Sequence, residues 1–156
     1  MRCLGCALAV LVSAAPVLRA QDNTAALGLP AVSTASAEAD RLYLYRHQGA
    51  NLEAAISLLE AQLRAAPSDP AWLWRLGRSL VRQGERQAGK KERLVLYGRA
   101  EGLLRQAVAL SPSDAQAHFW LGLAMGRRGQ ARGILRSLFL IGPLRQEMST
   151  VLALDP

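Results

Sequence analysis

Cysteine, histidine and aromatic residues are scarce in this chain of 156 residues. It has two cysteines and two histidines, and aromatic residues make up 5% of it. Because Cys3 and Cys6 both lie at the extreme N-terminus, the rest of the chain can form neither a disulfide nor a cysteine-ligated metal centre. Beyond residue 20 there are five valines, three isoleucines and three threonines. So few β-branched residues disfavour strands.

Good helix formers dominate what remains, above all leucine, alanine, arginine, glutamine and glutamate. Hydrophobic residues make up 51% of the chain and charged residues 20%, which is too apolar for a disordered polymer. The composition therefore predicts a single all-α domain folded around a core.

The first 20 residues have the pattern of a signal peptide. Arg2 supplies the positive start, residues 3–15 are apolar and uncharged, and Ala20 ends a small-residue cleavage site. An uncleaved anchor and a lipoprotein acylated at Cys6 are the alternatives. Cleavage after Ala20 leaves 17 basic and 12 acidic residues, a net charge of +5. We therefore expect a periplasmic or secreted protein.

Two further segments follow the signal peptide. Residues 21–36 are small and polar, are interrupted by Gly28 and Pro30 and show no hydrophobic period, which predicts a flexible linker. Residues 37–156 carry amphipathic stripes and should form the folded domain.

Capping residues and prolines divide this domain into helices. Asp69 and Asp114 are predicted N-caps of helices that end near Gly84 and Gly129, and Asn51 of a helix through Ala65. Apolar residues at helical spacing predict two more helices, one over 92–110 and a last one with a stripe of Leu144, Met148, Val151 and Leu152.

The helix ends recur along the chain. Pro67, Pro112 and Pro156 close related strings and lie 45 and 44 residues apart. The pattern of Leu73, Leu76, Gly77 and Gly84 returns as His118, Leu121, Gly122 and Gly129. This resembles the tetratricopeptide repeat, a unit of two antiparallel helices and about 34 residues. The resemblance implies a tetratricopeptide-like α-solenoid of about three repeats, two with insertions, around residues 85–96 and 132–143.

A narrower resemblance rests on residues 73–76, the lysine-rich insertion leading to Tyr97, and residues 117–120 and 133–134. These are similar to the regulator of microtubule dynamics family of tetratricopeptide proteins. Members are described as microtubule-associated helical-repeat proteins, some at membranes. Because a signal peptide would separate the chain from microtubules, the resemblance here implies the fold and a scaffold role.

Catalytic and cofactor motifs are missing from the sequence. His118 takes the place of a core aromatic in the repeat, which predicts a packed, hydrogen-bonded histidine. The serines at 68, 111 and 113 are explained as turn and cap residues, and no glycine-rich phosphate loop occurs. We expect no enzymatic activity, no metal and no cofactor.

The tetratricopeptide resemblance implies a concave groove lined by the first helix of each repeat. The predicted peptide-binding groove consists of Trp74, Arg78, Arg82, Phe119, Leu123 and Arg127. Aromatic and arginine side chains together suit a carboxylate-bearing peptide. The alternative is that the aromatics pack against neighbouring helices and the arginines are solvated.

These features predict a non-enzymatic exported scaffold that binds a polypeptide, with an acidic one expected. A basic nucleic-acid-binding module is an alternative because the isoelectric point is about 10.4, although export and interleaved acids argue against nucleic acid. An accessory subunit of an envelope enzyme complex is another. Since the last helix has no following helix to cover it, self-association through the C-terminal helix is also expected.

Overall fold

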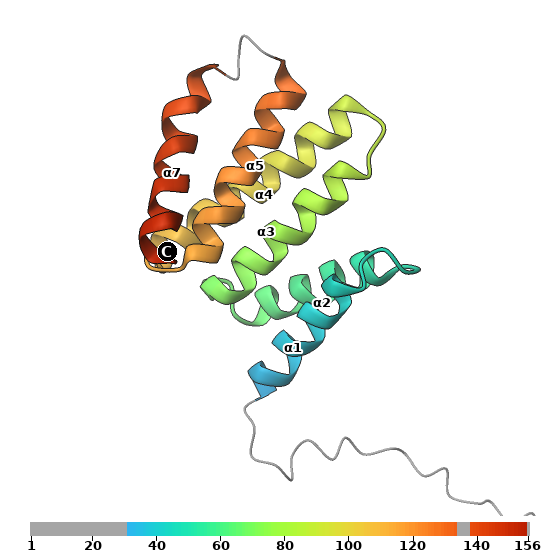
Figure 1. The fold of residues 1–156 in the computed structure, drawn as a ribbon. Coiled ribbons are helices and arrows are strands. Elements are labelled where there is room, and N and C mark those ends of the chain that lie inside the picture. Colours follow the sequence, from blue (N-terminus) through green and yellow to red (C-terminus); the bar gives the residue numbers. More distant parts are fainter. Residues whose placement is uncertain (1–30, 134–137, 156) are drawn as a thin grey trace, which may run out of the picture.

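The computed structural model describes residues 31–133 and 138–155, and all regular structure in these two ranges is helical. Each helix packs against the next, so the chain forms a stack in sequence order (Figure 1). The predicted all-α helical-repeat class is confirmed. The described elements are α1 (Ala31–Leu44), α2 (Asn51–Ala65), α3 (Pro70–Glu85), α4 (Lys90–Leu110), α5 (Ala115–Arg132), the short 3₁₀ helix η2 (Leu138–Leu140) and α7 (Ile141–Leu154).

Aspartate caps begin α3 and α5, as the sequence predicts. Asp69 Oδ1 accepts a hydrogen bond of 2.8 Å from the Ala71 amide. Asp114 Oδ1 accepts one of 2.9 Å from the Gln116 amide. Each carboxylate satisfies an amide that has no partner within its helix, and its charge complements the positive end of the helix dipole.

The prediction that Asn51 caps α2 is wrong. The helix spans Asn51–Ala65, but Ala50 precedes it and no side chain caps it. The Asn51 side-chain Nδ2 instead donates a hydrogen bond of 3.0 Å to the Tyr45 carbonyl. Gly49, with φ at 50°, turns the chain there, a conformation that glycine adopts without steric cost. Asn51 therefore joins the end of α1 to the start of α2.

The predicted linker is also too long at its C-terminal end, because α1 begins at Ala31. Ala39 is fully buried and Ala35 packs against the core, so small side chains allow a close helix contact where the hydrophobic period is weak. The predicted signal peptide and residues 21–30 lie outside the described residues. No helix in the described ranges has both the length and the apolar character needed to cross a membrane.

The core runs from α1 to α5, and leucine and alanine are its commonest residues. Burial of each leucine side chain is worth about 1.5–3 kcal/mol relative to exposure. α3 supplies more of the core than any other described helix, because neighbours cover α3 on two sides. Among the described residues, the largest inaccessible side chains are Trp72, Leu52, Leu59, Leu73, Leu76, Leu80, Leu104, Leu121 and Met125.

One packing contact occurs twice, one repeat apart. A Cβ added to Gly77 on α3 would lie 2.5 Å from Leu104 Cγ on α4. A Cβ added to Gly122 on α5 would collide with Met148 on α7. In each pair a glycine lets a side chain from the next helix seat against its backbone, so the sequence repeat is also a repeat of contacts.

The two insertions have different outcomes. The first lengthens α4, which has 21 residues and begins at Lys90. The second includes η2, which leads directly into α7. The sequence predicts both outcomes in general terms, namely a longer helix or a short additional one.

Gly77→Ala should destabilise the protein. The overpacking cost of about 1–3 kcal/mol exceeds the gain of about 1 kcal/mol from replacing a helical glycine by alanine. Gly102→Ala is the matched control, since no atom lies within 4 Å of a Cβ there, and it should stabilise by about 0.5–1 kcal/mol. Urea unfolding measures both. Equal stability of the two variants would contradict the close α3–α4 contact.

Candidate functional site

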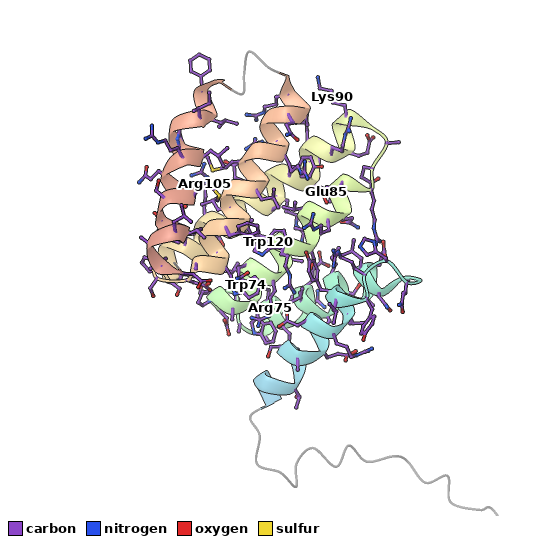
Figure 2. All side chains as sticks on the ribbon, viewed as in Figure 1. Trp74, Arg75, Glu85, Lys90, Arg105 and Trp120 are labelled. Carbon is purple, nitrogen blue, oxygen red and sulfur yellow. The ribbon has the colours of Figure 1, made fainter. Side chains whose placement is uncertain are left out.

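The side chains of the predicted groove lie on α3 and α5, with α1 packed beside α3. Figure 2 shows Trp74, Arg75 and Trp120 near the place where these helices meet. Successive turns of α3 present Trp74, Arg78 and Arg82 on one side of the helix. On this side they contact side chains of α1.

Asp40 of α1 joins this helix to α3. Its carboxylate lies 2.6 Å from Arg78 Nη2 and 3.0 Å from Arg75 Nη2. The arginine side chains are 11% and 16% exposed, and Asp40 is 38% exposed. Burial disfavours the charged carboxylate, but the hydrogen bonds and charges of Arg75 and Arg78 outweigh it. The pKa of Asp40 is therefore lowered.

Aromatic rings complete this junction. The Arg78 guanidinium lies 3.7 Å from the centre of the Tyr43 ring and 5.0 Å from that of Trp74. Tyr43 in turn meets Trp120 edge to face, with ring centres 6.2 Å apart. Arg82 Nε donates 3.2 Å to the Tyr43 hydroxyl and lies 5.2 Å from the Trp120 ring. These cation–π and edge contacts link α1, α3 and α5.

We call Tyr43, Trp74, Arg78, Arg82 and Trp120 the arginine–aromatic cluster. It occupies the N-terminal half of the predicted groove with the protein's own side chains. Trp74 and Arg78 are each 9% exposed, so little of either is accessible to a ligand. The packing alternative stated for the sequence therefore describes Trp74, whereas Arg78 is buried and paired with Asp40 and not solvated as that alternative expects.

The other predicted groove residues are more open. Phe119 is 40% exposed and lies edge-on against Trp120 at 5.3 Å, and Leu123 is half-buried. Arg82 and Arg127 meet as their equivalent repeat positions predict, because both bind Glu85. Arg82 Nη1 lies 2.8 Å from one Glu85 oxygen and Arg127 Nε 2.8 Å from the other.

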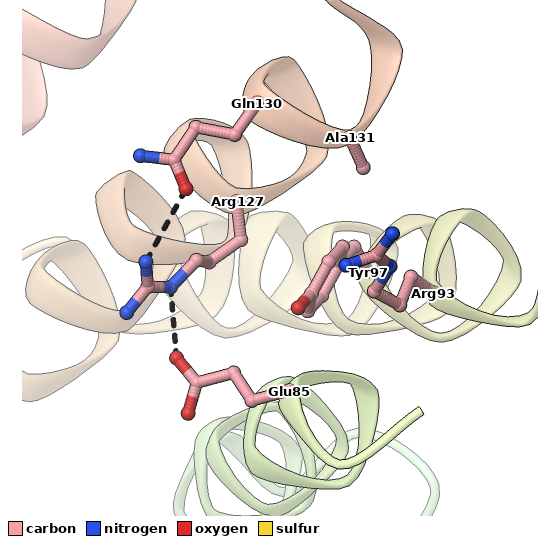
Figure 3. A pocket seen from close by; sticks show the side chains of 6 residues that line it. All are labelled: Glu85, Arg93, Tyr97, Arg127, Gln130 and Ala131. Carbon is pink, nitrogen blue, oxygen red and sulfur yellow. Dashed lines mark hydrogen bonds and ion pairs between the residues drawn. The ribbon is translucent and has the colours of Figure 1, made fainter. Parts of the chain in front are cut away.

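A pocket of about 450 Å³ adjoins this bridge (Figure 3). We call it the Arg93 pocket; its lining residues are Glu85, Arg93, Tyr97, Arg127, Gln130 and Ala131. It lies between the end of α3, the first turns of α4 and the end of α5. Of the predicted groove, only Arg127 belongs to it.

Arg93 and Tyr97 are residues that the sequence reasoning missed. Arg93 lies in the insertion that lengthens α4, and Tyr97 directly follows that insertion, so the tetratricopeptide pattern gives neither residue a place in the groove. The sequence feature that could have indicated Tyr97 is Gly84, because a Cβ at this position would lie 2.5 Å from Tyr97 Cε1. This glycine admits the tyrosine ring against α3.

The polar groups of the Arg93 pocket are unequally satisfied. Glu85 is bound by two guanidiniums, whereas the Arg93 side chain has no hydrogen-bond or ion-pair partner among the described residues, and its Nε is inaccessible. Burial and the Glu85 charge raise the pKa of Tyr97, against the opposing effect of Arg127 and Arg93. The phenol therefore keeps its proton at neutral pH and is a hydrogen-bond donor.

His118 has a structural role, as predicted. It is 7% exposed, its Nδ1 lies 2.6 Å from the Glu147 carboxylate, and its Nε2 lies 2.9 Å from the Pro112 carbonyl. The Glu147 contact holds α7 against α5, and the Pro112 contact ties α5 to the turn that precedes it. Within the ranges that the structure describes, no group of three or more His, Cys, Asp or Glu side chains could hold a metal ion.

A scan against protein families matches residues 35–156 to regulator of microtubule dynamics protein 1-3. The chain belongs to this family. The family match begins inside α1 and continues through α7, so Asp40 and Tyr43 lie within the family domain and not in a linker before it. A search of curated proteins finds no match.

Asp40→Asn should destabilise this family member by about 1–2 kcal/mol at neutral pH, because it leaves the buried Arg78 guanidinium without its anion. This figure allows for solvent screening at the partly exposed carboxylate. Glu38→Gln is the matched control, since it removes an exposed Glu38–Arg41 pair from the same helix and should have almost no effect. Thermal unfolding checks both.

The same pair predicts an acid dependence. Because the folded-state pKa of Asp40 is lowered, its stabilisation is fully present above the ordinary aspartate value of about 4 and is lost as pH falls below it. The difference in stability between wild type and Asp40→Asn should therefore shrink below about pH 4. A difference that is constant from neutral pH to pH 2 would contradict the ion pair.

Proposed function

We propose that this family member is a non-enzymatic scaffold of tetratricopeptide type that binds an acidic polypeptide on the face formed by α3, α5 and the start of α4. The observation that carries this proposal is the Arg93 pocket, where cationic and hydrogen-bonding groups converge and one guanidinium has no anion. Such a site suits a carboxylate supplied by another chain.

The tetratricopeptide assignment is supported by the repeated glycine contacts. Gly77 with Leu104 and Gly122 with Met148 occupy equivalent places in two successive helix pairs. In this type of repeat, the first helices line the face that holds peptides, and here these are α1, α3 and α5. Since α1 and the arginine–aromatic cluster fill one end of that face, the ligand belongs at the other.

Charge favours an acidic ligand over a basic one. In and beside the Arg93 pocket there are three guanidiniums, those of Arg82, Arg93 and Arg127, and one carboxylate, that of Glu85, which binds only Arg82 and Arg127. Lys90, Lys91 and Arg132 border a neighbouring hollow and have no carboxylate partner among the described residues. A field of this sign accelerates the approach of an anionic chain and weakens with salt.

Location is the second part of the proposal. The N-terminal pattern of Arg2, an apolar stretch and Ala20 favours export to the periplasm or the outside. The family name instead favours a microtubule-related role, which is our second candidate. Co-sedimentation with stabilised microtubules separates them, because tubulin is reachable only if residues 1–20 do not direct export.

We also propose self-association through α7. Its Ile141 and Leu152 are 58% and 71% exposed, and beside them Gly142, Gln146 and Ser149 help to line an open hollow. In the preceding repeat, α5 covers the corresponding side of α4, through contacts such as Arg128 with Glu101 at 2.8 Å. A second copy would cover α7 in the same way.

Selection of random displayed peptides on the full-length protein tests the scaffold function. Enriched sequences should be rich in Asp and Glu. Arg127→Gln should weaken the binding of these peptides about 3- to 10-fold, because it removes a cation at the proposed site. Arg64→Gln is the matched control; Arg64 forms no ion pair with the residues that the structure describes and borders a different hollow, between α2 and α4. Enrichment of basic peptides, or binding of DNA in preference to any peptide, would overturn the proposal.

Leu152→Lys should shift the protein toward monomer in sedimentation velocity at high concentration, because a charge then occupies the apolar contact. Leu44→Lys, at a similarly exposed leucine on α1, should leave the distribution unchanged. A wild-type protein that stays monomeric at the highest soluble concentration would refute self-association through α7.

A further inference from the structure

We propose that the Arg93 pocket anchors a carboxylate of the bound peptide, with the Arg93 guanidinium as its ion-pair partner and the Tyr97 hydroxyl as a second donor. This inference rests on the proposed peptide-binding function and assigns its anchoring point. The carboxylate belongs to an Asp or Glu side chain or to the peptide C-terminus.

The Arg93 side chain is a cation without an anionic partner among the described residues. It is only partly exposed, and its Nε is inaccessible and without an acceptor. Most other arginines along α3 and α5 are neutralised internally, for example Arg78 by Asp40 and Arg128 by Glu101. The accessible part of the guanidinium carries a positive charge with no carboxylate beside it, and a ligand carboxylate bound there would supply the missing anion.

The adjacent acid, Glu85, does not fill this role. One of its oxygens binds Arg82 and the other binds Arg127. Figure 3 shows Arg127 between Glu85 and Gln130, while Arg93 lies beside Tyr97. Glu85 thus holds Arg127 in place and leaves Arg93 available.

Further donors face the same space. The Tyr97 hydroxyl accepts or donates no hydrogen bond within the described residues, and the tyrosine, though 4% exposed, lines the pocket. The Gln130 carbonyl accepts 3.2 Å from Arg127 Nη1, so its amide hydrogens remain. Guanidinium, phenol and amide donors together match the two oxygens of a carboxylate.

The size of the pocket agrees with an anchoring role. A volume of about 450 Å³ is at the small end of the usual range for ligand sites, and it suits one or two peptide residues better than a long segment. The exposed face of α5 beside it, with Leu123 and Phe119, gives the adjoining residues an apolar surface.

Fluorescence anisotropy with two labelled peptides tests the anchor. The first has four glutamates and a free C-terminus; the second has four glutamines and an amidated C-terminus. The full-length wild type should bind the first and not the second. Arg93→Gln should weaken binding about 10- to 100-fold, the range for a charge-assisted hydrogen bond, and Tyr97→Phe about 3- to 10-fold.

Arg64→Gln is again the control for loss of one positive charge and should change binding less than about twofold. Arg93→Gln should melt at the wild-type temperature, because Arg93 takes part in no internal ion pair. If Arg93→Gln binds the glutamate peptide as wild type does while Arg127→Gln does not, the anchor is wrong and the peptide-binding function stands.

A second measurement examines the pocket without a peptide. Glutarate titrated into the wild type should shift the Arg93 Nε–Hε signal in a saturable way in NMR spectra, assigned by its absence from Arg93→Gln. If glutarate shifts this signal and no acidic peptide binds, the pocket is confirmed and the scaffold function fails. If inorganic phosphate saturates the signal at much lower concentration than glutarate, the site selects phosphate and the carboxylate assignment is overturned.

Discussion

The contact between α1 and α3 depends on one carboxylate. Asp40 sits between two guanidiniums of α3, and this contact brings Tyr43 over Arg78 and against Trp120 of the next repeat. Few large apolar side chains hold α1, since much of its inner face is alanine. The Asp40 carboxylate therefore holds α1 against α3, as leucine packing holds the later helices together. By placing Tyr43, it also determines which end of the face formed by α1, α3 and α5 is filled. The Arg93 pocket lies at the end that stays open.

The later helices are held by a different means. Glycines on α3 and α5 let side chains of the following helix approach their backbones, and the inaccessible leucines fill the space around them. Such contacts are local in sequence, because each helix pair forms within one repeat. The charged contacts, in contrast, join helices across repeats, as Arg127 does by reaching Glu85. Apolar packing thus holds the two helices of each repeat together, and ion pairs determine how one repeat lies against the next.

The sequence was sufficient for the helices and their order because their signals are local. Asp69 and Asp114 cap the helices predicted for them, and Gly77 and Gly122 pack as glycines should between close helices. The start of α1 was misjudged because alanine gives helical structure without a hydrophobic period. Asn51 was misjudged because a capping residue and a residue that bridges a turn look alike in sequence.

The candidate site was less predictable, since it depends on which side chains meet across repeats. Repeat positions correctly predicted that Arg82 and Arg127 lie close together, but not that Glu85 would join them. They also gave no reason for α1 to cover Trp74 and Arg78. Tyr43 lies outside the repeated motifs, so its contact with Trp120 could be found only from the arrangement of the helices.

The lengthened start of α4 has a consequence for how binding properties can change in this fold. Arg93 lies in the first turns of α4, which the basic repeat does not need, away from the part of the helix that packs Leu104 against Gly77. Tyr97, one turn further on, also packs against Gly84 in the core. Under the proposed function, substitutions of Arg93 would therefore change the ligand with little effect on how the helices pack, whereas substitutions of Tyr97 would change both.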